Sequence, residues 1–154
     1  MAAVSNGLKL SANVTDDVTV LSAAMEGSIT SSGEMSYSSS ARHFTLTSSR
    51  FMWETFKESA ASSSRIRSGL YIADVLSVKS SNLRQGNPTD VMELLSISID
   101  AGEDGAATVF LNFANDATLS LSVECINMTL TDVGDPWATD HIPTHETNDD
   151  KSSK

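Results

Sequence analysis

The sequence lacks the features that mark secreted and membrane proteins. Cys125 is the single cysteine in 154 residues, so no disulfide can form within the chain, and this predicts a reducing compartment, the cytoplasm. The stretch from Met1 to Val14 has neither the basic start nor the apolar segment of a signal peptide. No apolar run approaches the roughly 20 residues of a membrane-spanning helix. We therefore expect a cytoplasmic protein that does not enter a membrane.

Motifs that carry known chemistry are absent as well. A Gly-x-Ser-x-Gly nucleophile motif is missing, and the eight glycines are scattered instead of forming a phosphate-binding loop. Cys125 falls in the inward register of an expected strand, which favours core packing over reactivity. The histidines are His43, His141 and His145, and without cysteine partners they make a poor metal site. We expect no catalytic residue, no metal and no cofactor.

Basic residues are missing from the second half of the chain. Between Gln85 and Asp150 there are 13 acids and no Lys or Arg, whereas residues 42–84 hold seven of the ten basic residues. The net charge of −10 disfavours binding to nucleic acid or to an anionic membrane surface. Two interpretations of this uneven distribution stay open. Cross-strand pairs could neutralise the two regions, or the basic region could form a patch for an anionic ligand or an acidic partner.

The hydrophobic pattern predicts a mainly β protein with one helix. Apolar residues at helical spacing indicate a helix over about 16–26, followed by Gly27 as the terminating glycine. Residues 126–133 fit either a strand or a helix. Alternation of apolar and polar residues predicts antiparallel strands with short turns, at 8–12, 35–37, 43–51, 69–78, 95–100, 109–113 and 119–125.

The expected fold class is α+β. It is a twisted antiparallel β-sheet, or a partly closed β-roll or barrel, of six to eight strands with the N-terminal helix covering one face. A pleckstrin-homology-like roll is an analogue that rests on strand order alone. The length fits one domain, which we place at residues 1–142. Residues 143–154 are polar and charged without an apolar anchor, which predicts a disordered tail.

One local cluster combines arginine with tryptophan, two residue types that are enriched at binding hot spots. It comprises Arg50 and Trp53 in one segment, and Arg65 and Arg67 in the next. We predict that these four residues contact a ligand or a protein partner. The alternative is that Trp53 closes the end of the core while the arginines face water.

Several segments resemble the landmarks of a known family. They are Leu8-Lys-Leu, Arg50-Phe51-x-Trp53-Glu54, Arg67-Ser-Gly-Leu70, Val123-Glu-Cys-Ile126, Leu130-x-Asp132, Trp137-Ala-Thr139 and Pro143-x-His145-Glu146. The order and spacing of these segments over residues 7–146 resemble those of domain-of-unknown-function family 2948 of alphaproteobacteria. The resemblance implies a bacterial cytosolic protein without an assigned activity.

The leading functional hypothesis is a non-catalytic binding or accessory module for an acidic protein or an anionic small ligand. One alternative is a small enzyme with an inconspicuous acid–base site in which His43 or Asp74 acts. That alternative predicts a concave pocket with at least two converging titratable groups. Another alternative is a structural subunit of a homo-oligomer. The sequence leaves the ligand, the partner and the oligomeric state open.

Overall fold

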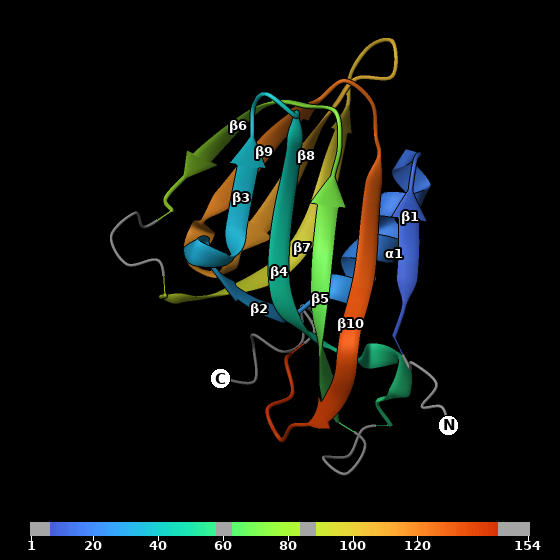
Figure 1. Cartoon of the computed structure of the whole chain (residues 1–154), viewed down its shortest axis with the longest axis vertical. Coiled ribbons are helices and arrows are strands. Elements are labelled where there is room, and N and C mark those ends of the chain that lie inside the picture. Colours follow the sequence, from blue (N-terminus) through green and yellow to red (C-terminus); the bar gives the residue numbers. More distant parts are fainter. Residues whose placement is uncertain (1–6, 58–62, 84–88, 145–154) are drawn as a thin grey trace, which may run out of the picture.

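The computed structural model describes residues 7–57, 63–83 and 89–144. Within these ranges ten strands form one antiparallel sheet, and a single α-helix packs beside it (Figure 1). The elements in chain order are β1 (Lys9–Ala12), α1 (Thr15–Met25), β2 (Ser28–Ser31), the 3-10 turn η1 (Ser32–Glu34), β3 (Met35–Ser38), β4 (His43–Phe51), η2 (Trp53–Thr55), β5 (Ser64–Ile72), β6 (Val75–Ser81), β7 (Val91–Ala101), β8 (Ala107–Phe113), η4 (Ala114–Asp116), β9 (Thr118–Val123) and β10 (Met128–Ala138).

The sheet is bent so that its two halves face each other. Its strand order is β1-β10-β5-β4-β2-β7-β8-β9-β6, and β3 pairs with β4 off this path. Figure 1 shows β4, β5 and β10 side by side in front, with β7, β8 and β9 behind them. The short strand β2 links the halves because it pairs with both β4 and β7. The end strands β1 and β6 are not neighbours, so the sheet is open.

Helix α1 follows the expectation from sequence. The Asp17 carboxylate accepts a hydrogen bond from the backbone N–H of Asn13 at 3.0 Å and so fixes the first turn. Gly27 follows the helix at φ +84°, a left-handed conformation that glycine adopts without steric penalty. The predicted helix and its terminating glycine are confirmed. The residues that α1 turns to the core recur at helical spacing. They are Val18, Leu21 and Met25.

The strand count of six to eight was wrong, because the sheet has ten strands. Strand β2 was missed because its four residues are too few for alternation to be visible, whereas β3 corresponds to the strand predicted at 35–37. The strand predicted at 69–78 is broken at Asp74, whose φ of +59° turns the chain between β5 and β6. Strand β6 lies at an edge of the sheet, and its Leu76 is 50% exposed. The pleckstrin-homology-like roll stays a prediction.

The strand interpretation of residues 126–133 is confirmed, since β10 begins at Met128 and buries Met128 and Leu130. The core position expected for Cys125 was wrong. Strand β9 ends at Val123, and Cys125 is exposed in the bend that follows. A hydrogen bond from its Sγ to Asp74 raises the pKa of the thiol, and a raised pKa disfavours the reactive thiolate.

The main core lies between the two halves of the sheet and under α1. A smaller apolar group, Phe51, Met52 and Ile66, is buried at one end of β4 and β5 outside this core. Pro143 is also buried, although the sequence placed it at the start of a tail. The domain limits stay a prediction, and residues 145–154 lie outside the described residues. No described helix has the length and apolar character needed to span a membrane.

Candidate functional site

The four residues predicted to bind a partner come from two paired strands. Arg50 lies one residue before the end of β4 and Trp53 begins η2, while Arg65 and Arg67 lie on β5. The ladder between β4 and β5 places Arg65 opposite Phe51 and Arg50 opposite Ile66. Because side chains alternate between the faces of a strand, Arg50 points into the molecule, whereas Arg65 and Arg67 point to the opposite face. The sequence cluster is therefore divided by the sheet.

Arg50 is completely buried and makes two bidentate ion pairs. Its Nε and Nη2 donate to the two carboxylate oxygens of Asp132 on β10, at 3.0 and 2.7 Å. Its Nη1 and Nη2 donate to the carboxylate of Glu54 at 3.1 and 2.7 Å. Nη1 also donates to the carbonyl oxygens of Ala24 and Phe51, each at 3.3 Å. Every N–H group of this guanidinium thus has a partner inside the protein.

Three hydrogen-bond donors hold the buried Asp132 carboxylate. It accepts hydrogen bonds from Arg50, from the Ser68 hydroxyl and from the backbone N–H of Leu8, the last at 2.7 Å. Burial alone would raise the pKa of Asp132, but these hydrogen bonds outweigh it and hold the pKa below its usual value. Burial alone would likewise lower the pKa of Arg50, and its two carboxylate partners raise it instead. Both groups are therefore charged at neutral pH, and they tie β4, β5, β10 and the start of β1 together.

Arg65 is also buried, with 5% of its surface exposed, but its partners differ. Its Nη1 donates to the carbonyl oxygens of Gly27 and Ser49, at 3.3 and 2.8 Å. Its guanidinium carbon lies 5.7 Å from the centroid of the Phe51 ring. Its Nη2 is buried, and no described residue forms a hydrogen bond with it. Leaving such a donor unsatisfied costs about 1–3 kcal/mol.

The charge of Arg65 is not neutralised by a contact. Among the described residues no carboxylate forms an ion pair with it, and Glu93 acts only through longer-range attraction. Burial lowers the pKa of Arg65, and Glu93 offsets this only in part. A buried cation without a paired anion is unusual in a folded protein. Arg65 is therefore the member of the cluster whose buried charge has no ion-pair partner among the described residues.

Trp53 closes this end of the molecule, as the alternative interpretation expected of it. Its indole Nε1 donates to the carbonyl oxygen of Glu26 at 2.8 Å, and its ring packs edge-on against Phe51 at 4.6 Å between centroids. A Cβ atom added to Gly27 would lie 2.6 Å from Pro143 and 3.9 Å from Trp53. Trp53, Arg65 and Pro143 therefore converge on Gly27, where no larger side chain fits.

Arg67 is the predicted cation that keeps a substantial exposed surface. It forms an ion pair with Glu34 at 3.1 Å, and both side chains are about two-fifths exposed, at 42% and 41%. Elsewhere Arg42 pairs with Glu124 at 2.6 Å. The pairs of Arg42 and Arg50 join the basic region of the sequence to the acidic one, as the first interpretation of the charge distribution expects. The expectation that the arginines face water was wrong for Arg50 and Arg65.

Sequence reasoning missed Asp132 and Pro143 as parts of this site. A signal for Asp132 was present, since Met128, Leu130 and Asp132 share one face of an alternating strand. An acid on the apolar face of a strand needs a buried cation as its partner. Pro143 was named only as part of a family landmark, and no hydrophobic pattern could place it here, because its contact with Gly27 spans more than a hundred residues of chain.

The enzyme hypothesis named His43 and Asp74. Neither lines the cavity of about 580 Å³ between α1 and β7, and neither lines a second cavity at β2. This cavity of about 610 Å³ lies where β2, β7 and η4 meet, and Asp90 and Glu93 contribute its carboxylates. His43 instead stacks on Tyr71 at 5.2 Å between ring centroids. In the described part of the chain, no three His, Cys, Asp or Glu side chains group closely enough to hold a metal ion. The enzyme hypothesis stays a prediction.

These features define a class: a mostly β protein with one helix on an open antiparallel sheet, held at one end by a buried arginine–carboxylate network. A family model described as protein of unknown function (DUF2948) matches residues 8–145, which is nearly the whole chain. The protein belongs to this family, and the resemblance seen in its sequence landmarks is confirmed. No curated protein and no solved structure gives a significant match.

Proposed function

We propose that this protein is a non-catalytic binding module that docks an acidic protein surface on the front of its sheet. The observation that supports this proposal is the charge of one face of the sheet. Outward residues of β1, β10, β5 and β4 form what is called here the outer face: Lys9, Ser11, Thr129, Thr131, Val133, Arg67, Gly69, Tyr71, Thr45, Thr47 and Ser49. This set contains two cations and no acid, and the acids beside it are Glu34, which pairs with Arg67, and the exposed Asp135 of β10, in a chain of net charge −10.

The composition of the outer face supports a protein partner. Tyr71 and Val133 are 44% and 52% exposed, and Trp137, at its lower border, is 43% exposed. Aromatic residues and arginine are enriched in the buried centres of protein interfaces, while acids are depleted there. Figure 1 shows β4, β5 and β10 without a helix in front of them. A flat face of this kind fits a partner surface better than it fits a small ligand.

Arg67 is the group that we expect to contact the partner's acids. Its pair with Glu34 is exposed, and exposed pairs contribute only about 0–1 kcal/mol. A carboxylate of the partner can therefore replace Glu34 at little cost. Arg50 serves this function indirectly, since its buried network fixes the end of β4 beside β5. Trp53 and Arg65 lie next to the outer face and are covered in this conformation.

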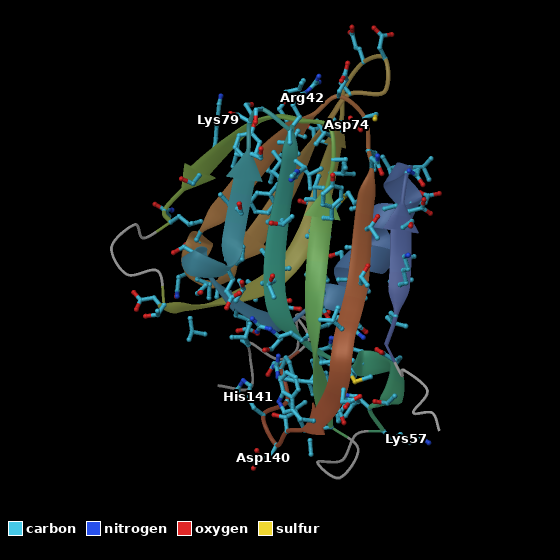
Figure 2. The ribbon with its side chains drawn as sticks, viewed as in Figure 1. Arg42, Lys57, Asp74, Lys79, Asp140 and His141 are labelled. Carbon is cyan, nitrogen blue, oxygen red and sulfur yellow. The ribbon has the colours of Figure 1, made fainter. Side chains whose placement is uncertain are left out.

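A charge-reversal pair of variants tests the proposal. Tagged full-length wild type, Arg67→Glu and Lys79→Glu are used for affinity purification from the native host, followed by mass spectrometry. Lys79 is exposed on the edge strand β6, away from the outer face, and its reversal changes net charge equally (Figure 2). An acidic partner that wild type and Lys79→Glu retain, and that Arg67→Glu binds at least about tenfold more weakly, supports the proposal. A partner that Arg67→Glu retains with unchanged affinity and salt dependence contradicts it.

A further inference from the structure

We propose that Arg65 is a latent binding site for an oxyanion group, a carboxylate or a phosphate, under a displaceable C-terminal segment. The segment is residues 138–144 and is called the strap here. In the described conformation the strap closes this end of the molecule. When the strap moves aside, the free Nη2 edge of the Arg65 guanidinium receives the anion. This site is separate from the outer face and does not depend on the protein partner proposed above.

The Arg65 guanidinium has the donor arrangement of an anion-binding site. Nη1 is committed to the carbonyl oxygens of Gly27 and Ser49, which hold the guanidinium in place. Nη2 is buried and has no hydrogen-bond partner among the described residues, and Arg65 as a whole is only 5% exposed. A guanidinium presents donors in a planar fork that matches the oxygens of carboxylates and phosphates. The unused edge of this fork is thus preorganised for such a group.

The path of the strap connects the two sides of Arg65. The strap begins directly after Trp137, the residue opposite Arg65 in the ladder between β10 and β5. It ends on Pro143, which packs against Gly27, and the carbonyl oxygen of Gly27 accepts a hydrogen bond from Arg65. The chain therefore leaves one flank of Arg65 and returns to the other. Figure 2 shows Asp140 and His141 of the strap at the end of the molecule opposite Arg42.

The strap is attached at few points. Ala138 is the last residue of β10 and pairs with Ser64 in the ladder with β5, and beyond it the N–H of Thr139 donates to the carbonyl oxygen of Ser63 at 3.1 Å. Asp140, His141 and Ile142 are exposed, and Pro143 is the buried anchor. A segment with so few buried contacts opens at low free-energy cost compared with the sheet beneath it. Weakening the Pro143 anchor should therefore expose the Arg65 site without unfolding the protein.

Intrinsic fluorescence reports on this site selectively. The chain contains two tryptophans, Trp53 and Trp137. Trp53 lies 3.9 Å from the Cβ position of Gly27, and Trp137 pairs with Arg65 in the ladder. Displacement of the strap changes the environment of both indoles, so an anion bound at Arg65 gives a saturable fluorescence change.

The test compares full-length wild type with Pro143→Gly, which keeps the backbone but removes the anchoring ring. Each protein is titrated with inorganic phosphate and, separately, with a hexaglutamate peptide, at ionic strength kept constant with chloride. We expect Pro143→Gly to bind at least one of the two probes about tenfold or more tightly than wild type, because the closed state no longer competes as well. Phosphate as the tighter probe identifies a free anion as the natural source, and the peptide identifies a protein carboxylate.

Three variants in the Pro143→Gly background decide whether Arg65 is the receptor. Arg65→Met removes the fork with little change in volume and should abolish saturable binding. Arg42→Met removes an exposed arginine at the other end of the molecule, paired with Glu124, and should leave binding unchanged. Arg65→Lys, which keeps the charge but loses the fork, should weaken binding about tenfold and serves as the test if Arg65→Met does not fold. Equal affinities of wild type and Pro143→Gly, or retention of binding by the Arg65 variants, would overturn the proposal.

Discussion

Arg50 on β4 and Asp132 on β10 form an ion pair with 2.7 Å between Nη2 and Oδ2, across the intervening strand β5, and neither side chain has any exposed surface. The pair joins residues 82 positions apart in the chain. Glu54 completes the network from the i+4 position and is 31% exposed. This relationship fixes the end of the sheet on which both proposed binding regions depend.

The first prediction concerns the strength of this network. Asp132→Asn leaves Arg50 buried with one carboxylate instead of two, so we expect the free energy of unfolding to fall by about 3–5 kcal/mol. The control is Glu34→Gln, which breaks the exposed pair with Arg67 and should change stability by less than about 1 kcal/mol. Urea denaturation measures both changes. Similar losses for the two variants would show that the buried pair has no special role.

The second prediction concerns acid stability. The folded-state pKa of Asp132 lies below its unfolded value, so its contribution to stability is complete above about pH 4 and is lost as the pH falls through the folded pKa. The wild-type free energy of unfolding should therefore decline below about pH 4, and the decline should be shallower in Asp132→Asn. Urea denaturation at several acidic pH values gives the two slopes. Identical slopes would mean that Asp132 is not a source of the acid sensitivity.

The third prediction concerns the close contact of Gly27 with Pro143. Gly27→Ala adds a Cβ at φ +84°, where it would lie 2.6 Å from the Pro143 ring. Gly105→Ala is the matched control, because its φ is +86° and nothing lies within 4 Å of the added atom. Gly105→Ala should cost about 1–2 kcal/mol for the backbone conformation alone, and Gly27→Ala should cost clearly more. Thermal melts compare the two variants. In the double variant with Pro143→Gly the excess should shrink, and additivity would contradict the contact.

The fourth prediction contrasts the two buried arginines through one substitution. Arg50→Met leaves the buried Asp132 without its cation and should destabilise by about 3–5 kcal/mol. Arg65→Met removes a cation that has no ion-pair partner among the described residues, but it leaves the carbonyl oxygens of Gly27 and Ser49 without their donor, so we expect a smaller loss of about 1–3 kcal/mol. Chemical denaturation of both variants tests the contrast. A loss at Arg65 as large as that at Arg50 would assign Arg65 a structural role and weaken the case for an anion site there.

Much of the local structure could be predicted from the sequence because it depends on neighbouring residues. Apolar spacing predicted α1, and alternation predicted β4, with Phe44 and Leu46 now found buried. Short strands such as β2 carry too few residues to show a pattern. The turn at Asp74 was missed because an aspartate at positive φ is a local exception that no periodicity announces.

The candidate site was predicted only in part, because it depends on which face of the sheet each residue occupies and on contacts between distant parts of the chain. The cluster of Arg50, Trp53, Arg65 and Arg67 was visible as composition, but adjacency in sequence does not say which face of the sheet each residue occupies. The sheet separates Arg50 from Arg65, and it brings Pro143 to Gly27 from the far end of the chain.

The sequence by itself determined which residues of each strand point inward, because side chains alternate along a strand whatever its neighbours are. By that rule Arg50 and Asp132 belong to the inward sets of their strands. Only the tertiary structure decided that these two charges meet, because their contact requires the order β10-β5-β4, and strand order is set by non-local pairing and core packing. It also placed Arg65, close to them in the sheet, on the opposite face, where no carboxylate of the described part of the chain forms an ion pair with it.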